Sequence, residues 1–366
     1  MPKNQHNKGE WSELYAFIKL LKDGRIYAAD ENVNKIENVY LPIIKLIKEN
    51  DDGSLDYFTG ETIKIFADGQ ELCEIDKSEF EVYGELLFRK IFEGGGNGAF
   101  KIPEIVEFLD KIKVSRVSAP GRDKVDLKMQ IHDINTGFEP EVGFSIKSDV
   151  GSPPTLLNSG KNTRVRYLIE GINDTDMDTI NSVTKETSDE YMKDRMLKLM
   201  ELATNIKFDK FLSDTYTDNL ILIDSALPAI YASLILQHYK HMANKIYDIK
   251  ELLQYVINEN PVNYSNPNIY TYKIKKLLCA SALGMTPGKE WDGLDAATGG
   301  YVIIKRDGDV LCYHLYNRNF FETYLLDNTR FDRPSASRYD YFYVYKEDDR
   351  YYIDLNVQVR FKSIKQ

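Results

Sequence analysis

The sequence predicts an α/β protein, because helical and strand-like patterns both recur along its 366 residues. Apolar side chains return at helical spacing over residues 9–22, and apolar and polar side chains alternate over residues 125–132 and 142–147. The apolar content of 43% provides for one large core or for two. We therefore expect amphipathic helices packed against a sheet that contains an antiparallel hairpin.

The first predicted helix carries two acidic residues in its opening turn. Residues 9–22 form one apolar stripe, and Glu10 and Glu13 lie three positions apart on the same face near its N-terminus. Carboxylates in a first turn favour the helix dipole, so both could be purely structural. The alternative is that one of them reaches a functional site beside the helix.

The patterns in residues 27–112 define the predicted elements less sharply. Short strand-like runs alternate with turns over residues 27–69, and residues 79–92 and 102–112 have helical patterns. Between these helices lies a glycine run, GGGNGAF, which matches neither a phosphate-binding loop nor a dinucleotide fingerprint. We expect it to be a loop between helices.

The alternating runs around residues 125–147 predict a hairpin that closes around residues 135–137. One face is apolar on both strands and the other is polar. A symmetric register would satisfy both faces at once. The predicted pairs are Asp126 with Lys147, Leu127 with Ile146, Lys128 with Ser145 and Met129 with Phe144.

An aspartate opposite a lysine on the polar face of a hairpin suits metal-dependent phosphodiester hydrolysis. The carboxylate can hold Mg²⁺, which neutralises charge on the phosphate, while the lysine orients the attacking water. A cross-strand pair of Asp126 and Lys147 on an ordinary surface is the alternative interpretation.

Three blocks of sequence carry a family resemblance. They are NKGEWSELYAFIKLLKDGRIYAAD near the N-terminus, FSIKSDVGSPPTLLNSGKNT after the hairpin turn, and TRFDRPSASR followed by YVYKEDDRYYIDLNVQVRF. In this order they resemble the HpaII family of type II restriction endonucleases. The resemblance implies a PD-(D/E)xK nuclease core, which is a mixed β-sheet flanked by helices, with a helical insertion and a β-rich C-terminal part. It also implies Mg²⁺-dependent cleavage of double-stranded DNA at a short specific sequence.

The resemblance assigns catalysis to Asp126 and Lys147, with two departures from the motif. Val125 replaces the motif's proline, and Ser145 stands where the motif has its second carboxylate. The metal is therefore one ligand short.

A glutamate elsewhere must supply that ligand. We expect Glu13 or Glu10 of the first helix to do so, in preference to Glu139 and Glu141 of the turn or Glu170 at the end of a later strand.

Two polar segments are candidate DNA contacts. The first follows Lys147, and the second is a loop with three arginines, whose planar fork suits guanine in the major groove. Either segment could instead be ordinary solvated surface. The first set is Ser152, Thr155, Asn158, Ser159, Lys161, Asn162, Thr163, Arg164 and Arg166, and the second is Arg330, Arg333 and Arg338, with Asn317 and Arg318 behind them.

The remaining patterns suggest three parts: residues 1–174 with the catalytic hairpin, a mostly helical region 175–290, and a β-rich region 291–366. In the last part we predict hairpins that turn at residues 306–308 and 347–349. In the helical part His238 and His241 lie three apart. Without a third ligand they are better explained as an exposed polar stripe than as a metal site.

The overall charge of −10 argues against a broadly basic DNA-binding surface but not against a basic cleft. Three scattered cysteines match no zinc spacing, and no signal peptide or membrane span is visible, which favours a cytoplasmic protein without membrane contact.

The most favoured function is a restriction endonuclease that cuts a short palindrome, such as a CCGG-like site, and leaves 5′-phosphates. It would act as a homodimer on DNA, paired with a methyltransferase of the same specificity. The alternatives are a structure-specific or repair nuclease of the same fold, and a non-catalytic sequence-specific DNA-binding protein.

Overall fold

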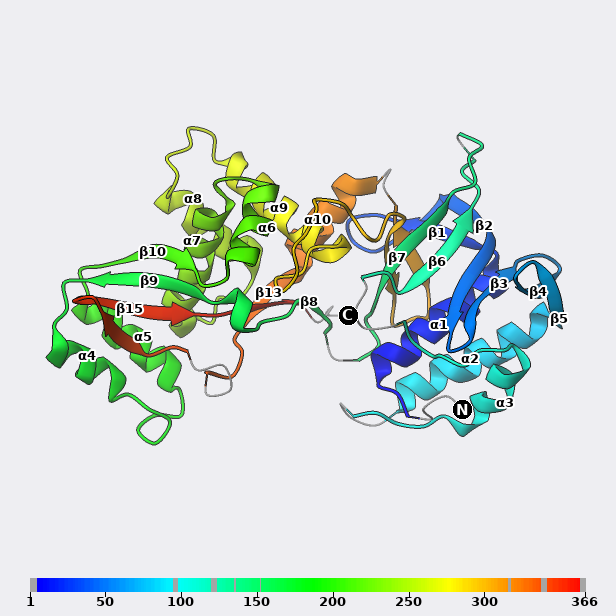
Figure 1. Cartoon of the computed structure of the whole chain (residues 1–366), viewed down its shortest axis with the longest axis horizontal. Coiled ribbons are helices and arrows are strands. Elements are labelled where there is room, and N and C mark those ends of the chain that lie inside the picture. Colours follow the sequence, from blue (N-terminus) through cyan, green and yellow to red (C-terminus); the bar gives the residue numbers. More distant parts are fainter. Residues whose placement is uncertain are drawn as a thin grey trace.

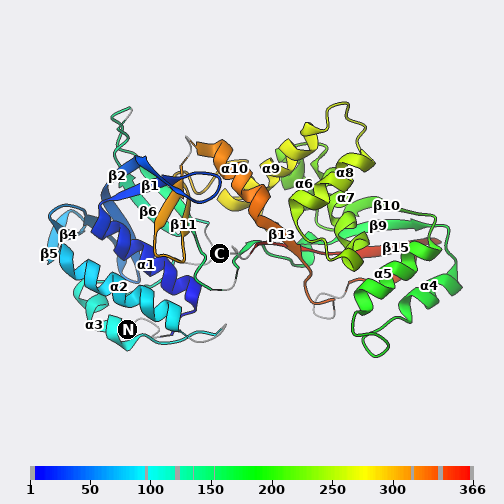
Figure 2. The same cartoon turned by 180° about the vertical axis from the view of Figure 1, so that it is seen from behind.

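The computed structural model describes residues 5–94, 98–119, 124–134, 136–151, 153–314, 317–336 and 341–362. They form two lobes joined by a narrower middle part (Figure 1). The view from behind shows the same arrangement, with helices α9 (Asn268–Leu283) and α10 (Arg318–Asn328) and strand β13 (Thr329–Asp332) between the lobes (Figure 2). Both strands and helices contribute to each lobe, which confirms the predicted α/β class.

The first lobe is built on a nine-stranded mixed sheet with the order β1-β12-β11-β7-β6-β2-β3-β4-β5. Strands β1 and β12 are parallel, as are β7 and β11, and the other neighbours are antiparallel. The first half of β2 also pairs with β1, so six strands form a closed circuit of pairings. The elements are α1 (Lys8–Asp23), β1 (Arg25–Ala29), β2 (Lys35–Asn50), β3 (Gly53–Phe58), β4 (Thr62–Ala67), β5 (Gln70–Asp76), α2 (Lys77–Glu93), α3 (Pro103–Lys111), β6 (Leu127–Ile131), β7 (Glu141–Ser148), β11 (Gly300–Ile304) and β12 (Val310–Tyr313).

Helix α1 occupies the residues predicted for the first helix and packs its apolar stripe into the core of this lobe. Its N-terminus is fixed by a capping box between Asn7 and Glu10, and it ends at Gly24, whose φ of 63° lies in the left-handed region. Leu14, Phe17 and Ile18 are fully buried. The helix therefore has a fixed position beside β7 and β2, with which it makes contact.

The catalytic hairpin is present, but the predicted register was wrong by two residues. Leu127 pairs with Phe144 and Lys128 with Gly143. The backbone bond from Asp133 to Phe138 closes the turn one residue nearer the N-terminus than a symmetric turn at 135–137 requires. Because a slip of two residues returns every side chain to its own face, the apolar pattern cannot distinguish the two registers.

The second lobe contains a four-stranded sheet with the order β10-β9-β15-β14, covered by helices (Figure 1). A three-stranded sheet, β13-β16-β8, lies in the middle part. The further elements are β8 (Thr155–Leu157), the 3₁₀ turn η1 (Lys161–Thr163), β9 (Val165–Glu170), α4 (Asp174–Asn181), α5 (Tyr191–Leu202), β10 (Asn205–Phe211), α6 (Asp214–Ile223), α7 (Leu227–Lys240), the 3₁₀ turn η2 (Met242–Asn244), α8 (Ile249–Glu259), β14 (Val344–Glu347), β15 (Arg350–Leu355) and β16 (Gln358–Phe361).

Both C-terminal hairpins are confirmed. Ile304 pairs with Val310 across the first turn, and Glu347 pairs with Arg350 across the second. Their strands join sheets that begin elsewhere in the chain, since β11 lies beside β7 and β15 beside β9. The division into 1–174, 175–290 and 291–366 stays a prediction, and each of the two larger sheets draws strands from more than one of these parts.

The predicted exposed stripe of His238 and His241 was wrong for His238. This residue is fully buried in α7, among the rings of Tyr239, Tyr247 and Phe331. The signal that was missed is that α7 is apolar around most of its circumference, as expected of a buried core helix. His241 lies beside the ring of Tyr255.

Within the described residues, no single helix is long and apolar enough to span a membrane, and α6 with α7 would qualify only as a pair bent by 108°. Helices α2 and α3 flank the glycine run, as predicted, although residues 95–97 lie outside the described part of the chain.

Candidate active site

Asp126 lies at the entrance of β6 and is held by the neighbouring strand. Its backbone N–H donates to the carbonyl of Phe144 at 2.9 Å. The N–H of Ile146 donates to its Oδ2 atom at 2.6 Å, and the Ser145 hydroxyl donates to the same atom at 3.2 Å. The Ser145 hydroxyl therefore stabilises the Asp126 carboxylate, whereas a carboxylate at position 145 would repel it.

Glu13 reaches the neighbourhood of Asp126 from the first turns of α1. Its Oε2 atom accepts a hydrogen bond from the N–H of Ala119 at 3.1 Å. Burial, together with the negative charge of Asp126, raises the pKa of Glu13 to about 8. Of the two glutamates considered on this helix, Glu13 is the one that interacts with Asp126.

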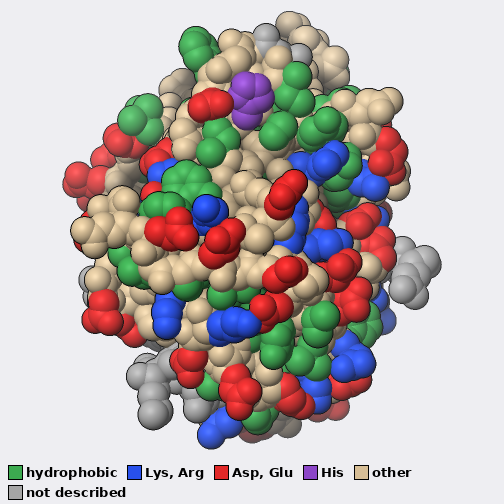
Figure 3. Space-filling view, turned by 90° about the vertical axis from the view of Figure 1, so that its right-hand side faces the viewer, with side chains coloured by type: hydrophobic (Ala, Val, Ile, Leu, Met, Phe, Trp, Pro, Cys, Tyr) green, Lys and Arg blue, Asp and Glu red, His purple; other side chains and the backbone are tan. Residues whose placement is uncertain are grey.

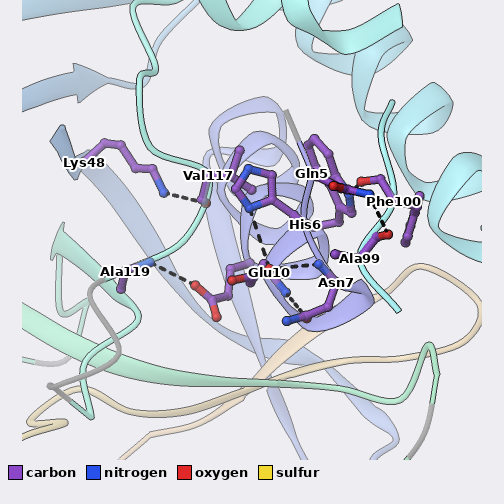
Figure 4. A network of polar contacts seen from close by, with 11 residues as sticks. Gln5, His6, Asn7, Glu10, Lys48, Ala99, Phe100, Val117 and Ala119 are labelled. Atoms are coloured by element: carbon purple, nitrogen blue, oxygen red, sulfur yellow. Dashed lines mark hydrogen bonds and ion pairs between the residues drawn. The ribbon is translucent and has the colours of Figure 1, made fainter. Parts of the chain in front are cut away.

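Glu10 has a different environment. It accepts a hydrogen bond from the N–H of Asn7 at 2.8 Å and lies 3.6 Å from the imidazole of His6 (Figure 4). These contacts complete the capping box of α1. The expectation that Glu10 could be a metal ligand is corrected, because its carboxylate is used to begin the helix.

The other glutamates that were weighed are also committed elsewhere. Glu139 pairs with His132 at 3.1 Å, Glu141 with Lys45 at 2.8 Å and Glu170 with Lys207 at 2.9 Å.

Lys48 of β2 is a buried charge that the sequence-based site did not include. Only 7% of it is exposed, and its Nζ atom donates to the carbonyl of Val117 at 3.0 Å. The chain continues from Val117 to Ala119, whose N–H binds Glu13, so Lys48 and Glu13 hold the same segment (Figure 4). Burial lowers the pKa of Lys48, while the charges of Glu13 and Asp126 oppose that shift. The signal was available, since Leu46 is buried and residue 48 lies on the same side of the strand.

Lys147 opens into a cleft of about 700 Å³ between the N-terminus of α1 and the middle part of the molecule. The positive charge of Lys147 acts on Glu13, which lines the same cleft. The cleft also contains Lys8, Thr155 and Arg360. Lys147, a carboxylate and two further cations thus line one cleft, as does Ile146, whose N–H binds Asp126.

A second pocket, of about 370 Å³, lies at the junction of the first lobe with residues 284–296. Asp126, Lys48 and Lys124 line it. Lys124 donates from Nζ to the carbonyl of Ser281 in α9 at 3.1 Å. Burial and the charge of Lys147 lower the pKa of Lys124 to about 8, and Asp126 opposes that shift.

In the described part of the chain no group of three or more His, Cys, Asp or Glu side chains could hold a metal. Asp126 and Glu13 are two carboxylates close enough for the charge of Asp126 to act on Glu13. Mg²⁺ commonly binds proteins through one or two carboxylates and takes its other ligands from water and substrate phosphates. The repulsion that raises the pKa of Glu13 is the repulsion that a bound cation would relieve.

Comparison with known sequences identifies the family. The HpaII restriction endonuclease family matches residues 7–361. The chain belongs to this family. It is 39% identical over 360 residues to "Type II restriction enzyme HpaII" of Haemophilus parainfluenzae, which covers 97% of this chain and 98% of that relative. No solved structure matches the chain significantly.

Membership of this restriction endonuclease family confirms the resemblance and the expectation of an enzyme that acts on DNA. The charge pattern agrees with a cleft as the DNA site. Acidic and basic side chains are interspersed over the outer end of the first lobe (Figure 3), whereas lysine and arginine line the cleft beside Asp126.

The polar segment after Lys147 is only partly available to DNA. Asn158, Lys161 and Asn162 are exposed. Thr163 is buried, and its hydroxyl donates to Asn356 at 2.8 Å and accepts from the N–H of Gly160. The predicted DNA contact of Thr163 is therefore corrected to a structural role, and Ser152 lies outside the described residues.

The two predicted arginine readers that the structure describes have different neighbours. Arg330 lies in β13 directly opposite Arg360 of β16. Arg333 lies in a different pocket, where it donates to the sulfur of Met242 and faces the ring of Tyr247. Arg338 lies outside the described residues.

Two further arginines are used within the protein. Arg318, which follows Asn317 at the start of α10, lies 3.4 Å from both Asp295 and Glu322. Arg166 pairs with Glu347 at 2.7 Å and packs against tyrosine rings in the second lobe.

Arg360 is a cleft residue that the sequence analysis missed. Its guanidinium donates to Thr155 and to Asp332, each at 3.3 Å, and lines the cleft that contains Lys147. Arg360 lies in the last of the three sequence blocks that carry the family resemblance. The alternating pattern of that strand does not indicate that the strand lies at the active site.

Proposed function

We propose that the protein is a Mg²⁺-dependent type II restriction endonuclease with a PD-(D/E)xK-type site, which cuts both strands of DNA at a short palindrome. A CCGG-like sequence is the first candidate site, and the products carry 5′-phosphates. The observation that carries this proposal is the meeting of Glu13, Asp126 and Lys147 from three separate elements beside one cleft, in a chain of a restriction endonuclease family.

Each of the two carboxylates is held by hydrogen bonds of its own. Asp126 and Glu13 would hold the ion, which supplies charge neutralisation at the phosphate and an acidified water when bound. Asp126 is fixed by Ile146 and Ser145, and Glu13 by Ala119. This fixed geometry means that neither carboxylate must reorient when the phosphate arrives.

Lys147 is assigned to the water and the scissile phosphate. It lies on the cleft beside Glu13, and its ammonium group can donate three hydrogen bonds. A lysine in this position orients the attacking water and stabilises negative charge as the phosphate is attacked.

DNA contacts are assigned to the exposed residues near the cleft. Asn158, Lys161 and Asn162 suit backbone or base contacts, and Arg360 and Arg330 extend the cationic surface across the three-stranded sheet. A symmetric site would be cut by a homodimer, with one active site for each strand. A methyltransferase of the same specificity would protect the DNA of the host.

The test is digestion of unmethylated phage DNA with Mg²⁺ and with EDTA, by the wild type and by Lys147→Ala. Lys19→Ala is the matched control, since Lys19 lies on α1 and pairs with Asp23 on the outside of the site. Discrete bands that require the metal and Lys147 but not Lys19 would support the proposal, and end sequencing would give the cut position.

Two other results would each replace the proposal. Metal-dependent cleavage without preferred ends would indicate a structure-specific or repair nuclease. Specific binding of a duplex without cleavage would indicate a non-catalytic DNA-binding protein, an alternative that Ser145 in the acidic position keeps open.

A further inference from the structure

A second pocket, separate from the cleft of Lys147, is lined by both acidic and basic side chains. Its volume is about 370 Å³, and its walls come from β2, from residues 124–128 and from the segment after α9. Asp126, Lys124, Thr286 and Trp291 line it. Asp126 therefore forms part of the wall of this pocket, whereas Glu13 and Lys147 line the cleft.

The ammonium group of Lys124 belongs to the wall of this pocket. Its hydrogen bond goes to a neutral carbonyl, that of Ser281. Lys128 on the same pocket pairs with the carboxylate of Glu49 at 2.7 Å, which neutralises it. Lys124 is attracted by Asp126, but it is also repelled by Lys147.

Several charges lie close together around Asp126. Lys48 is attracted by Glu13, Glu49 and Asp126, whereas Lys124 is attracted by Asp126 and repelled by Lys147. Two ammonium groups that repel each other in a partly buried site are costly unless an anion joins them. A divalent cation held by Asp126 would add positive charge beside Lys124, which a bound anion would offset.

We propose that Lys124 binds a backbone phosphate of the cleaved DNA strand in this pocket, next to Asp126. This inference rests on the proposed nuclease function, because it names a substrate contact of the same site. A phosphodiester accepts charge-assisted hydrogen bonds and supplies the missing negative charge. With Lys147 at the reacting phosphate, Lys124 would hold a second phosphate of the same strand.

Binding of the phosphate would also affect the contact between the first lobe and α9. Lys124 ties the segment before β6 to α9 through Ser281. A phosphate in the pocket would compete with that carbonyl for the ammonium hydrogens, of which three are available. The alternative explanation is that Lys124 is only a link between these two elements.

The experiment separates these explanations with Lys124→Gln, which keeps a hydrogen-bond donor but removes the charge. Binding of a duplex that contains the cleaved sequence is measured at several NaCl concentrations, with Ca²⁺ in place of Mg²⁺. We expect about tenfold weaker binding, as for the loss of one charged hydrogen bond. The slope of log affinity against log salt should fall by about 0.9 for each Lys124 in the complex.

The matched control is Lys45→Gln. Lys45 lies on β2 and, like Lys124, is partly exposed, but it pairs with Asp56 and Glu141, each at 2.8 Å, outside both cavities. Its replacement should leave the salt slope unchanged. Lys124→Arg keeps the positive charge and should restore the slope, which also covers the case in which Lys124→Gln folds poorly.

A scan with methylphosphonates then locates the contact. Each phosphate around the cut is made neutral in turn, and the loss of affinity is compared between the wild type and Lys124→Gln. The proposal requires one position whose neutralisation weakens the wild type but not the variant. An unchanged salt slope, or identical scans, would overturn it and leave Lys124 as a link between elements.

The failure of the nuclease assignment would look different. In that case the wild-type protein would not cut the duplex, whatever the variant does. A wild type that cuts normally, together with a variant of unchanged salt slope, would reject the role of Lys124 alone.

Discussion

Replacing Glu13 with glutamine should make the metal-free protein more stable while it abolishes cleavage. Burial and the charge of Asp126 raise the pKa of Glu13 from 4.5 to about 8. For a carboxyl group whose folded pKa is raised, the cost to stability is absent below the unfolded pKa. It grows as the pH rises to the folded pKa, by about 1.4 kcal/mol per pH unit.

The magnitude follows from these values. A solution at pH 7 lies well above the ordinary glutamate pKa of 4.5 and still below the folded pKa of about 8. The cost is therefore about 3 kcal/mol, and Glu13→Gln removes it while its side-chain oxygen still accepts the bond from Ala119. At pH 4.5 the variant and the wild type should differ by less than about 0.5 kcal/mol.

Glu10→Gln is the matched control on the same helix. Because glutamine can serve in a capping box, we expect a stability change below about 1 kcal/mol and normal cleavage. Urea titrations at pH 4.5 and pH 7, in EDTA, give the free energies of unfolding, and Trp11 on α1 provides the fluorescence signal. A Glu13→Gln variant that is less stable than the wild type at pH 7, or that gains equally at both pH values, would refute the reasoning. Normal cleavage by Glu13→Gln with loss in Glu10→Gln would refute the assignment of the metal ligand.

Three further predictions concern the core, the hairpin and the cleft. Burial and the nearby charge of Arg333 lower the pKa of His238 to about 3, so its contribution to stability is present above pH 6.5 and is lost as the pH falls. Between pH 7.5 and pH 5, His238→Phe should therefore lose about 2 kcal/mol less stability than the wild type, while between pH 7.5 and pH 8.5 the difference between the two should stay constant. Equal loss of stability at low pH in urea titrations would contradict this. A β-carbon at Gly143 would lie 2.8 Å from Cγ1 of Val125, the neighbour of Asp126, so Gly143→Ala should cost about 1–3 kcal/mol and slow single-turnover cleavage. Val125→Ala in the same chain should restore the rate, and no rescue would show that the contact is not the cause. Arg360→Gln should change stability by less than about 1 kcal/mol but weaken DNA binding about tenfold, and unaltered binding in a filter assay would remove Arg360 from the DNA interface.

The sequence was sufficient for the elements that depend on local pattern. The helix at residues 8–23 and the C-terminal hairpins follow from periodicity and turn residues. The two faces of the catalytic hairpin were also predicted, but its register depends on backbone bonds in the turn between Asp133 and Phe138, which side-chain periodicity does not report.

The candidate site shows the same limit at longer range. Glu10 and Glu13 are equivalent by spacing, and only the position of α1 against β7 decides which of them approaches Asp126. Lys124 and Arg360 were not identified because their neighbours, Ser281 and Thr155, lie 157 and 205 positions away in sequence. Contacts at such separations are set by the arrangement of sheets, which a single sequence does not reveal.

The order of strands in the large sheet has a consequence for the synthesis of the protein. Strand β7, which follows Asp126 and carries Lys147, has β6 on one side and β11 on the other, and β11 begins at Gly300. A ribosome has therefore translated more than four fifths of the 366 codons before the second neighbour of β7 exists. Pairings of such long range form late in folding. A nascent or truncated chain would lack a complete sheet, so a cell that makes this nuclease would be exposed to its activity only when translation is nearly finished.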